Sequence, residues 1–240
     1  MILRLVVLVG FLAALGAFYT LLQEAGIVGE QSQERDEPVF ADVPEDHPQR
    51  GPIEMVVSTD IMQGVNDDLF NPDAPVTRAE FAEIVVRTMG WEVQADLRPG
   101  FEDVEERAYL DREDYIAVVS SRGVMLGVQN EPPRFGPDQE LQAGHAVIVF
   151  VRAAREYMPD PEPQPDPDIV AQDYSAALEE ALTAAAANGL LGGTGLDPTG
   201  GDMSAPITRA QAAGLAANVR ALLDEDGETT AVESDGRGRA

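Results

Sequence analysis

Two short segments place an arginine directly after a threonine that can cap a helix. They read Val76-Thr77-Arg78-Ala79-Glu80 and Ile207-Thr208-Arg209-Ala210-Gln211. A threonine followed three residues later by Glu or Gln forms a capping box, in which each side chain satisfies a backbone N–H group at the helix start. We therefore interpret Thr77, Glu80, Thr208 and Gln211 as capping residues with a structural role.

Helix formation alone does not explain the two arginines. Arg78 and Arg209 occupy the first helical position, where the helix dipole is already positive and a cation costs about 0.3 kcal/mol or more. Unpaired N–H groups, the dipole and the guanidinium all favour an anion at that place. Arg78 and Arg209 are therefore the candidate ligand-binding residues, and an ion pair with a neighbouring acid is the alternative.

The charge balance excludes several classes of partner. The chain has 43 acidic residues against 16 basic ones, all of them arginine, which gives a net charge of −27. Nucleic acids and anionic membrane surfaces both require a basic face, so we expect neither as a partner. The chain contains no cysteine, which removes disulfides, thiolate nucleophiles and zinc bound by cysteine.

Catalysis and metal binding have little support in the sequence. The two histidines, His47 and His145, lie far apart in the chain, and we expect no catalytic residue, no resident metal and no cofactor. A glycoside hydrolase needs two positioned carboxylates, but among 43 acidic residues any spacing can be found, so such a pair does not indicate this activity. The acid-rich loop 66–73 keeps calcium binding open as an alternative, although it lacks the ligand spacing of an EF-hand.

Three similar units of about 60 residues fill the body of the chain. The first opens with Phe40-Ala41-Asp42-Val43 and the second with Phe101-Glu102-Asp103-Val104. Each unit then has an amphipathic stretch, with apolar residues such as Ile53, Val56 and Val57 on one helical face. The three stretches are followed by the similar segments 60–64, 123–127 and 189–193. We predict that helices end just before Asp60, Gly123 and Gly189, because Gly, and next Asp or Asn, tolerate a positive φ.

A turn-rich loop and a second helix complete each unit. Segments 66–73, 133–138 and 197–202 are rich in Asn, Asp, Gly and Pro, so we predict turns and not strands. Second helices are expected from Arg78 to about Met89, from Ala143 to about Glu156 and from Arg209 to about Leu223. The second unit has Gln142-Ala143-Gly144-His145 in place of the capping box and arginine, and we interpret His145 as a surface or capping residue.

The resulting organisation has seven parts. A signal peptide or signal anchor is expected at 1–29, because the 18 residues that follow Arg4 are apolar or small apart from Tyr19 and Thr20. The other parts are a polar spacer (30–37), unit one (38–95), unit two (96–157), a stiff proline-rich linker (158–168), unit three (169–224) and a disordered tail (225–240). One helical hairpin of this size is marginal alone, so the units should share a core.

The units resemble the S-layer homology repeat, in three tandem copies from about Phe40 to Leu223. The Phe-x-Asp-Val opening, the Phe70-Asn71-Pro72 turn and the Ile/Val-Thr-Arg-Ala-Glu segment carry the resemblance. It implies an all-α fold, mainly helical with long loops, in which helix-loop-helix repeats form a three-pronged, pseudo-threefold assembly around a central helical bundle.

The same resemblance implies a function. Grooves between the prongs would hold an exported cell-envelope protein noncovalently to a secondary cell-wall polymer, often a pyruvylated glycan, or to peptidoglycan. The family's ligand-contacting arginine carries over onto Arg78 and Arg209 only, because Ala143 stands at the third position. A non-catalytic envelope scaffold that makes protein contacts, and a calcium-binding envelope protein, remain the alternatives. The N-terminal segment would anchor the chain in the membrane if it is not cleaved.

Overall fold

A computed structural model describes the backbone of residues 40–94, 96–105 and 112–236, and side chains as far as Glu225. The expected signal or anchor at 1–29 and the spacer at 30–37 lie outside these residues. The chain divides into two compact parts, 1–37 and 38–240, and the description that follows concerns the second. Within the described part of the chain, no helix has the length and apolar character needed to cross a membrane.

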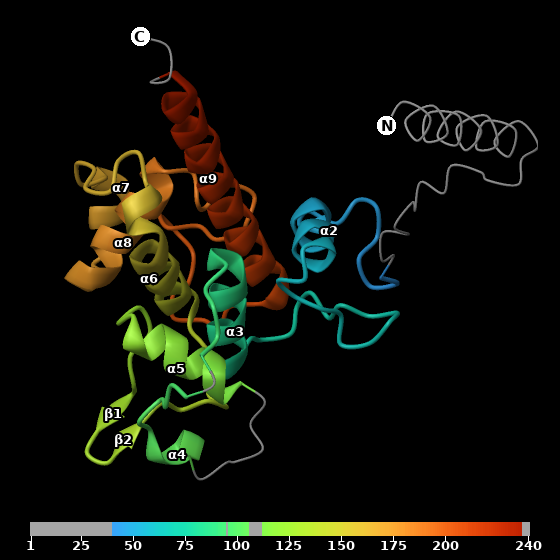
Figure 1. The fold of residues 1–240 in the computed structure, drawn as a ribbon. Coiled ribbons are helices and arrows are strands. Elements are labelled where there is room, and N and C mark those ends of the chain that lie inside the picture. Colours follow the sequence, from blue (N-terminus) through green and yellow to red (C-terminus); the bar gives the residue numbers. More distant parts are fainter. Residues whose placement is uncertain (1–39, 95, 106–111, 237–240) are drawn as a thin grey trace, which may run out of the picture. The chain divides into compact units, whose positions relative to one another are not determined.

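The described part is mainly helical, as predicted, with one short hairpin of strands (Figure 1). The main helices are α2 (Arg50–Ser58), α3 (Arg78–Met89), α5 (Glu113–Ser121), α6 (Ala143–Ala154), α8 (Ala176–Ala187) and α9 (Arg209–Gly236). The shorter elements are α4 (Glu102–Glu105), β1 (Gln129–Asn130), β2 (Pro133–Arg134), η1 (Arg155–Tyr157) and α7 (Pro167–Val170).

The second helices of the three units, α3, α6 and α9, contact one another in the middle of the fold (Figure 1). Phe81 of α3 meets Phe150 of α6 edge to face, with ring centroids 5.2 Å apart, and both side chains are buried. Aromatic pairs favour this arrangement. Leu215 of α9 belongs to the same cluster of buried residues, so the three helices share a hydrophobic core.

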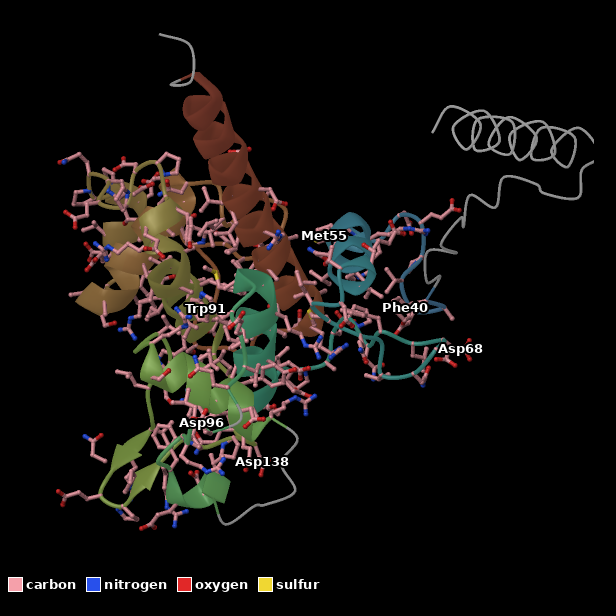
Figure 2. All side chains as sticks on the ribbon, in the orientation of Figure 1. Phe40, Met55, Asp68, Trp91, Asp96 and Asp138 are labelled. Atoms are coloured by element: carbon pink, nitrogen blue, oxygen red, sulfur yellow. The ribbon has the colours of Figure 1, made fainter. Side chains whose placement is uncertain are left out.

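The first helices pack in a cyclic order that the sequence does not reveal. Helix α5 packs on α3, α8 on α6 and α2 on α9. Each first helix thus lies against the second helix of a neighbouring unit and not against its own. In Figure 2, Phe40, Met55 and Asp68 lie on the side of the fold formed by α2 and the loop that follows it.

Three loop residues close a ring of backbone hydrogen bonds at the core. Val76 N–H donates to Ile207 O (3.0 Å), Ile207 N–H to Leu141 O (2.8 Å) and Leu141 N–H to Val76 O (2.9 Å). All three side chains are buried. Each of these residues directly precedes the segment that starts α3, α6 or α9, so the ring fixes the three helix starts relative to one another.

Each of these helix starts is also capped by the loop of another unit. Arg78 N–H donates to Gln139 O and Ala79 N–H to Pro137 O, both at the start of α3. The corresponding bonds run from Ala143 and Gly144 at α6 to Ala205 and Met203, and from Arg209 and Ala210 at α9 to Ala74 and Pro72. N–H groups at a helix start have no partner inside the helix. The three loops supply those partners in a cycle, and we call these contacts the three junctions.

The opening Phe-x-Asp-Val segment has a clear structural role. The Asp42 carboxylate accepts hydrogen bonds from the N–H groups of Phe70 (2.9 Å) and Asn71 (2.7 Å). In the second unit, Asp103 accepts from Phe135 (2.9 Å) and Gly136 (2.8 Å). The aspartate therefore holds the turn-rich loop against the beginning of its own unit.

The predicted helix ends are confirmed. Asp60, Gly123 and Gly189 have φ values of 59°, 69° and 73°. Helices α2, α5 and α8 end two residues before them, at Ser58, Ser121 and Ala187.

The prediction of turns without strands at 133–138 is wrong at its first two residues. Strand β2 pairs antiparallel with β1, Gln129 opposite Arg134 and Asn130 opposite Pro133. The segment from Gly127 to Phe135 is two residues longer than the matching segment from Gly64 to Phe70. The added length lets the two arms of the loop pair before they turn.

Two other segments also differ from expectation. The proline-rich segment was expected to be a stiff extended linker, but Met158 is buried and the backbone of Asp160 exchanges two hydrogen bonds with the Asn188 side chain. The segment is therefore held against α8. The expected disordered tail is helical as far as Gly236, where α9 ends. No proline interrupts this stretch, and an established helix gains one hydrogen bond per added residue.

Candidate functional site

Both capping boxes are present at the helix starts. Glu80 N–H donates to the Thr77 hydroxyl, and the Glu80 carboxylate accepts from Thr77 N–H. At α9, Thr208 N–H donates to Gln211 Oε1 (3.1 Å), and Gln211 N–H donates to the Thr208 hydroxyl (3.2 Å). The sequence places these four residues at helix starts, and their polar groups satisfy the backbone there.

Arg78 is docked into the loop of the second unit. Its Nε donates to Phe135 O (2.8 Å) and its Nη2 to Leu126 O (2.6 Å), while the guanidinium lies 4.7 Å from the centre of the Phe135 ring. Arg78 is only 8% exposed. Burial lowers the pKa of this arginine, and the charge of Asp103 acts in the opposite direction.

Arg209 makes the same contacts with the loop of the first unit. Its Nε donates to Phe70 O (2.8 Å), its Nη2 donates to Gln63 O (2.6 Å), and the guanidinium lies 4.6 Å from the centre of the Phe70 ring. Arg209 is partly exposed, unlike Arg78. Within the described residues neither arginine forms an ion pair, so both guanidinium groups are held by carbonyl oxygens and an aromatic face.

The third junction replaces the arginine with other donors. Ala143 begins α6 there, and the matching carbonyls belong to Gly192 and Gly201. The Asn218 side chain donates to Gly192 O (2.8 Å), and the Tyr174 hydroxyl lies 3.4 Å from Gly201 O. Asn218 and Tyr174 therefore take the place of the missing guanidinium at these two carbonyls, of which Gly192 is exposed and Gly201 partly exposed.

A hollow of about 330 Å³ lies between the first unit and the two arginines contributed by the others. We call it the first groove. Its wall is formed by residues 60–65, which follow α2, together with Glu80, Glu83, Ile84, Arg87, Arg112 and Arg209. Three units therefore contribute arginines to one hollow in a chain whose net charge is −27.

An ion-pair network organises the first groove. The Glu83 carboxylate bridges Arg87 Nε (3.0 Å) and Arg112 Nε (2.7 Å). Arg87 Nη1 also donates to the Asp60 carboxylate and backbone carbonyl, each at 2.9 Å. The pKa of Asp60 is lowered, mainly by a hydrogen bond from Gln63 and further by the Arg87 charge. The network fixes the side chains of α3 against the segment that follows α2.

Sequence reasoning missed Glu83, Arg87 and Arg112 as groove residues. Glu83 and Arg87 are four residues apart on a helix, a spacing that favours an ion pair and was available as a signal. Arg112 carries no local signal, because only the packing of α5 on α3 brings it to Glu83. The structure brings Arg209 into the first groove and places Arg78 at a different junction.

His145 is exposed beside the start of α6, as the surface interpretation predicted. It lines a second hollow of about 380 Å³ with Tyr174, Asp202 and Ser204. Partial loss of hydration beside α6, followed by the charges of Arg78 and Arg152, lowers the pKa of His145. The described residues contain no group of three His, Asp or Glu side chains placed to hold a metal ion.

Comparison with known proteins gives a family match within the first unit. The model of the S-layer homology domain matches residues 39–82. A cell surface protein of Thermoanaerobacter kivui is 30% identical over 118 residues, which is 48% of this chain and 15% of that protein. The S-layer protein sap of Bacillus anthracis is 31% identical over 91 residues, which is 38% of this chain and 11% of that protein.

The S-layer protein of Bacillus thuringiensis subsp. finitimus is likewise 31% identical over 91 residues, with the same coverage. The chain therefore spans only 11 to 15% of the length of these relatives. The chain is mainly helical, and its residues 39–82 match the S-layer homology domain. That domain includes the first unit's loop and the beginning of α3, which form much of the first groove.

Proposed function

We propose that this chain is a non-catalytic cell-envelope protein that binds wall polysaccharide, either a secondary cell-wall polymer or peptidoglycan, through grooves between three repeats. The repeats are those at 38–95, 96–157 and 169–224, arranged as three prongs around α3, α6 and α9. Export by the segment 1–29 is part of this proposal. The observation that carries it is the first groove, where arginines of all three units line one hollow.

The composition of the groove fits a sugar polymer with sparse negative charge. Arginine forks bind carboxylates and phosphates, whereas Asp60, Glu80 and Glu83 accept hydrogen bonds from sugar hydroxyls. The three acids beside the three arginines would repel a densely charged polyanion. At physiological ionic strength the remaining charge of the chain is screened beyond about 8 Å. The groove therefore selects isolated anionic groups flanked by hydroxyls.

We propose unequal roles for the two arginines predicted from sequence. Arg209 contacts the ligand in the first groove, because it lines that hollow and is partly exposed. Arg78, at the junction with the loop of the second unit, makes a weaker contact, because its 8% exposure leaves little surface for a ligand. Several weak sites still give firm attachment when they engage one polymer.

Co-sedimentation with wall sacculi tests the proposal. The purified full-length chain is mixed with intact sacculi and with sacculi stripped of secondary polymers by acid. Binding to intact sacculi alone assigns the secondary polymer, and equal binding to both assigns peptidoglycan. A chain that stays in the supernatant in both cases overturns the proposed function.

A non-catalytic scaffold that makes protein contacts is the second candidate. The third junction favours it, because Asn218 and Tyr174 occupy the carbonyls that hold an arginine elsewhere. A repeat without a docked arginine still presents a folded surface to a protein partner. Failure to sediment with sacculi, together with retention of the fold, would support this candidate.

A further inference from the structure

We propose that Arg112 is a second ligand-contacting residue, which acts with Arg209 in the first groove, and that Glu83 positions it. This inference rests on the proposed wall binding and adds a residue outside the Thr-Arg-Ala-Glu segment. Arg112 comes from the second unit and is the N-cap residue of α5. Arg209 comes from the third unit at the start of α9.

The three arginines of the groove differ in how many N–H groups remain available. Arg87 donates through Nε, Nη1 and Nη2 to Glu83, Asp60 and Tyr115. It is therefore committed to the fold. Arg112 donates only through Nε, and the structure gives its two terminal nitrogens no partner among the described residues. Arg209 Nη1 is equally without a partner in that part of the chain.

Electrostatics favours an anion between Arg112 and Arg209. Burial lowers the pKa of Arg209; the charge of Glu80 raises it, and the charge of Arg112 lowers it again. Arg112 and Arg209 line the same hollow, so their like charges repel each other there. An anionic group placed between them would accept hydrogen bonds from both and relieve the repulsion.

Glu83 fixes the position of Arg112 through Nε and leaves the two terminal nitrogens available to a ligand. The carboxylate takes Arg112 Nε at 2.7 Å and is itself held by Arg87 at 3.0 Å. The Glu83 and Arg112 side chains are 22% and 38% exposed, so the pair lies at the edge of the hollow. The guanidinium is therefore oriented before the ligand arrives, which reduces the entropy cost of binding.

The other units lack an arginine at this position. Arg112 precedes Gly123 by eleven residues, and the residues eleven before Asp60 and Gly189 are Gln49 and Leu178. Leu178 packs against Gly144 of α6, and Gln49 donates weakly to Gly193 O at 3.5 Å. The paired arginines therefore occur only in the first groove among the described residues. We infer that this groove contributes most of the affinity.

The test measures binding of the full-length chain to intact sacculi at about 50 and 300 mM salt. Arg112→Gln should weaken binding at low salt at least tenfold and flatten the salt dependence, because one charge contact is lost. Arg112→Lys should recover part of the affinity, since the charge returns without the fork. Arg152→Gln is the matched control, an exposed arginine on α6, and should bind like wild type.

The outcomes separate the inference from the proposed function. Arg112 contacts the fold only through its partly exposed ion pair with Glu83, and such pairs contribute little to stability, so thermal unfolding of Arg112→Gln should stay close to that of wild type and exclude a folding defect. If wild type sediments and Arg112→Gln sediments equally with the same salt dependence, the inference is wrong while wall binding stands. If wild type does not sediment at all, the proposed function fails and the inference fails with it.

Discussion

Gly64 offers a quantitative test of how the Phe-x-Asp-Val segment packs. A Cβ atom added at Gly64 would lie 2.5 Å from Phe40 Cε1, 2.5 Å from Asn66 O and 2.9 Å from Leu69 O. Two of these atoms belong to the backbone and cannot rotate away. Overpacking of this kind costs about 1–3 kcal/mol, so we expect Gly64→Ala to destabilise the fold by roughly 2–3 kcal/mol.

The expected change in melting temperature follows from the size of the fold. For a domain of about 200 residues, 1 kcal/mol corresponds to roughly 2–4 °C. Gly64→Ala should therefore lower the melting temperature by roughly 4–12 °C in thermal unfolding followed by circular dichroism. Gly192→Ala is the matched control, because its nearest neighbour, Gly189 O, would lie 3.4 Å away. It should change stability by less than about 0.5 kcal/mol.

A double-mutant cycle with Phe40 sharpens this test. Removing the Phe40 ring with Phe40→Ala relieves one of the close contacts, so Gly64→Ala should cost less in that background by at least about 0.5 kcal/mol. Equal melting temperatures for Gly64→Ala and Gly192→Ala would refute the packing of the Phe40 ring on Gly64. If the losses of stability caused by Phe40→Ala and Gly64→Ala simply add in the double mutant, the direct contact between the Phe40 ring and residue 64 is refuted.

Three further predictions concern the capping, loop and titration features. Thr77→Ala should destabilise the fold by about 1 kcal/mol in urea unfolding, because it removes the capping hydroxyl, and Thr77→Ser should restore most of it. Asp103→Asn should destabilise more than Thr77→Ala, because a neutral amide replaces a carboxylate that accepts two backbone N–H groups. His145 has a lowered pKa, first through partial loss of hydration and then through Arg78 and Arg152. Folding therefore favours its neutral form, and stability should fall as the pH drops through about 6.5. In His145→Gln the loss of melting temperature between pH 7.5 and 5.5 should be smaller.

The repeat pattern predicted local structure well, because the signals are local. The positive φ at Asp60, Gly123 and Gly189 follows from residue type and the end of an apolar period. The starts of α3, α6 and α9 follow from capping residues and periodicity. Such features depend on a few neighbouring residues, so a single sequence contains the information.

The candidate site was predicted only in part, because it is assembled from long-range contacts. Arg209 was identified through its helix start, but the carbonyls of Phe70 and Gln63 that hold it are far away in sequence. Arg112 enters the first groove only because α5 packs on α3. The spacing of apolar residues shows which face of a helix is buried, but it does not show which helix of a neighbouring unit covers that face. This pairing therefore cannot be predicted from a single sequence.

Nuclear magnetic resonance of the full-length chain with polysaccharide released from wall sacculi tests wall binding at the first groove most directly. We predict that backbone amide signals of Gln63, Gly64 and Arg112, together with the Arg209 side chain, shift as polymer is added. Signals of Gly144 and Gly192 at the third junction should stay in place and serve as internal controls. Shifts centred on the third junction, or no shifts at saturating polymer, would contradict the proposed site.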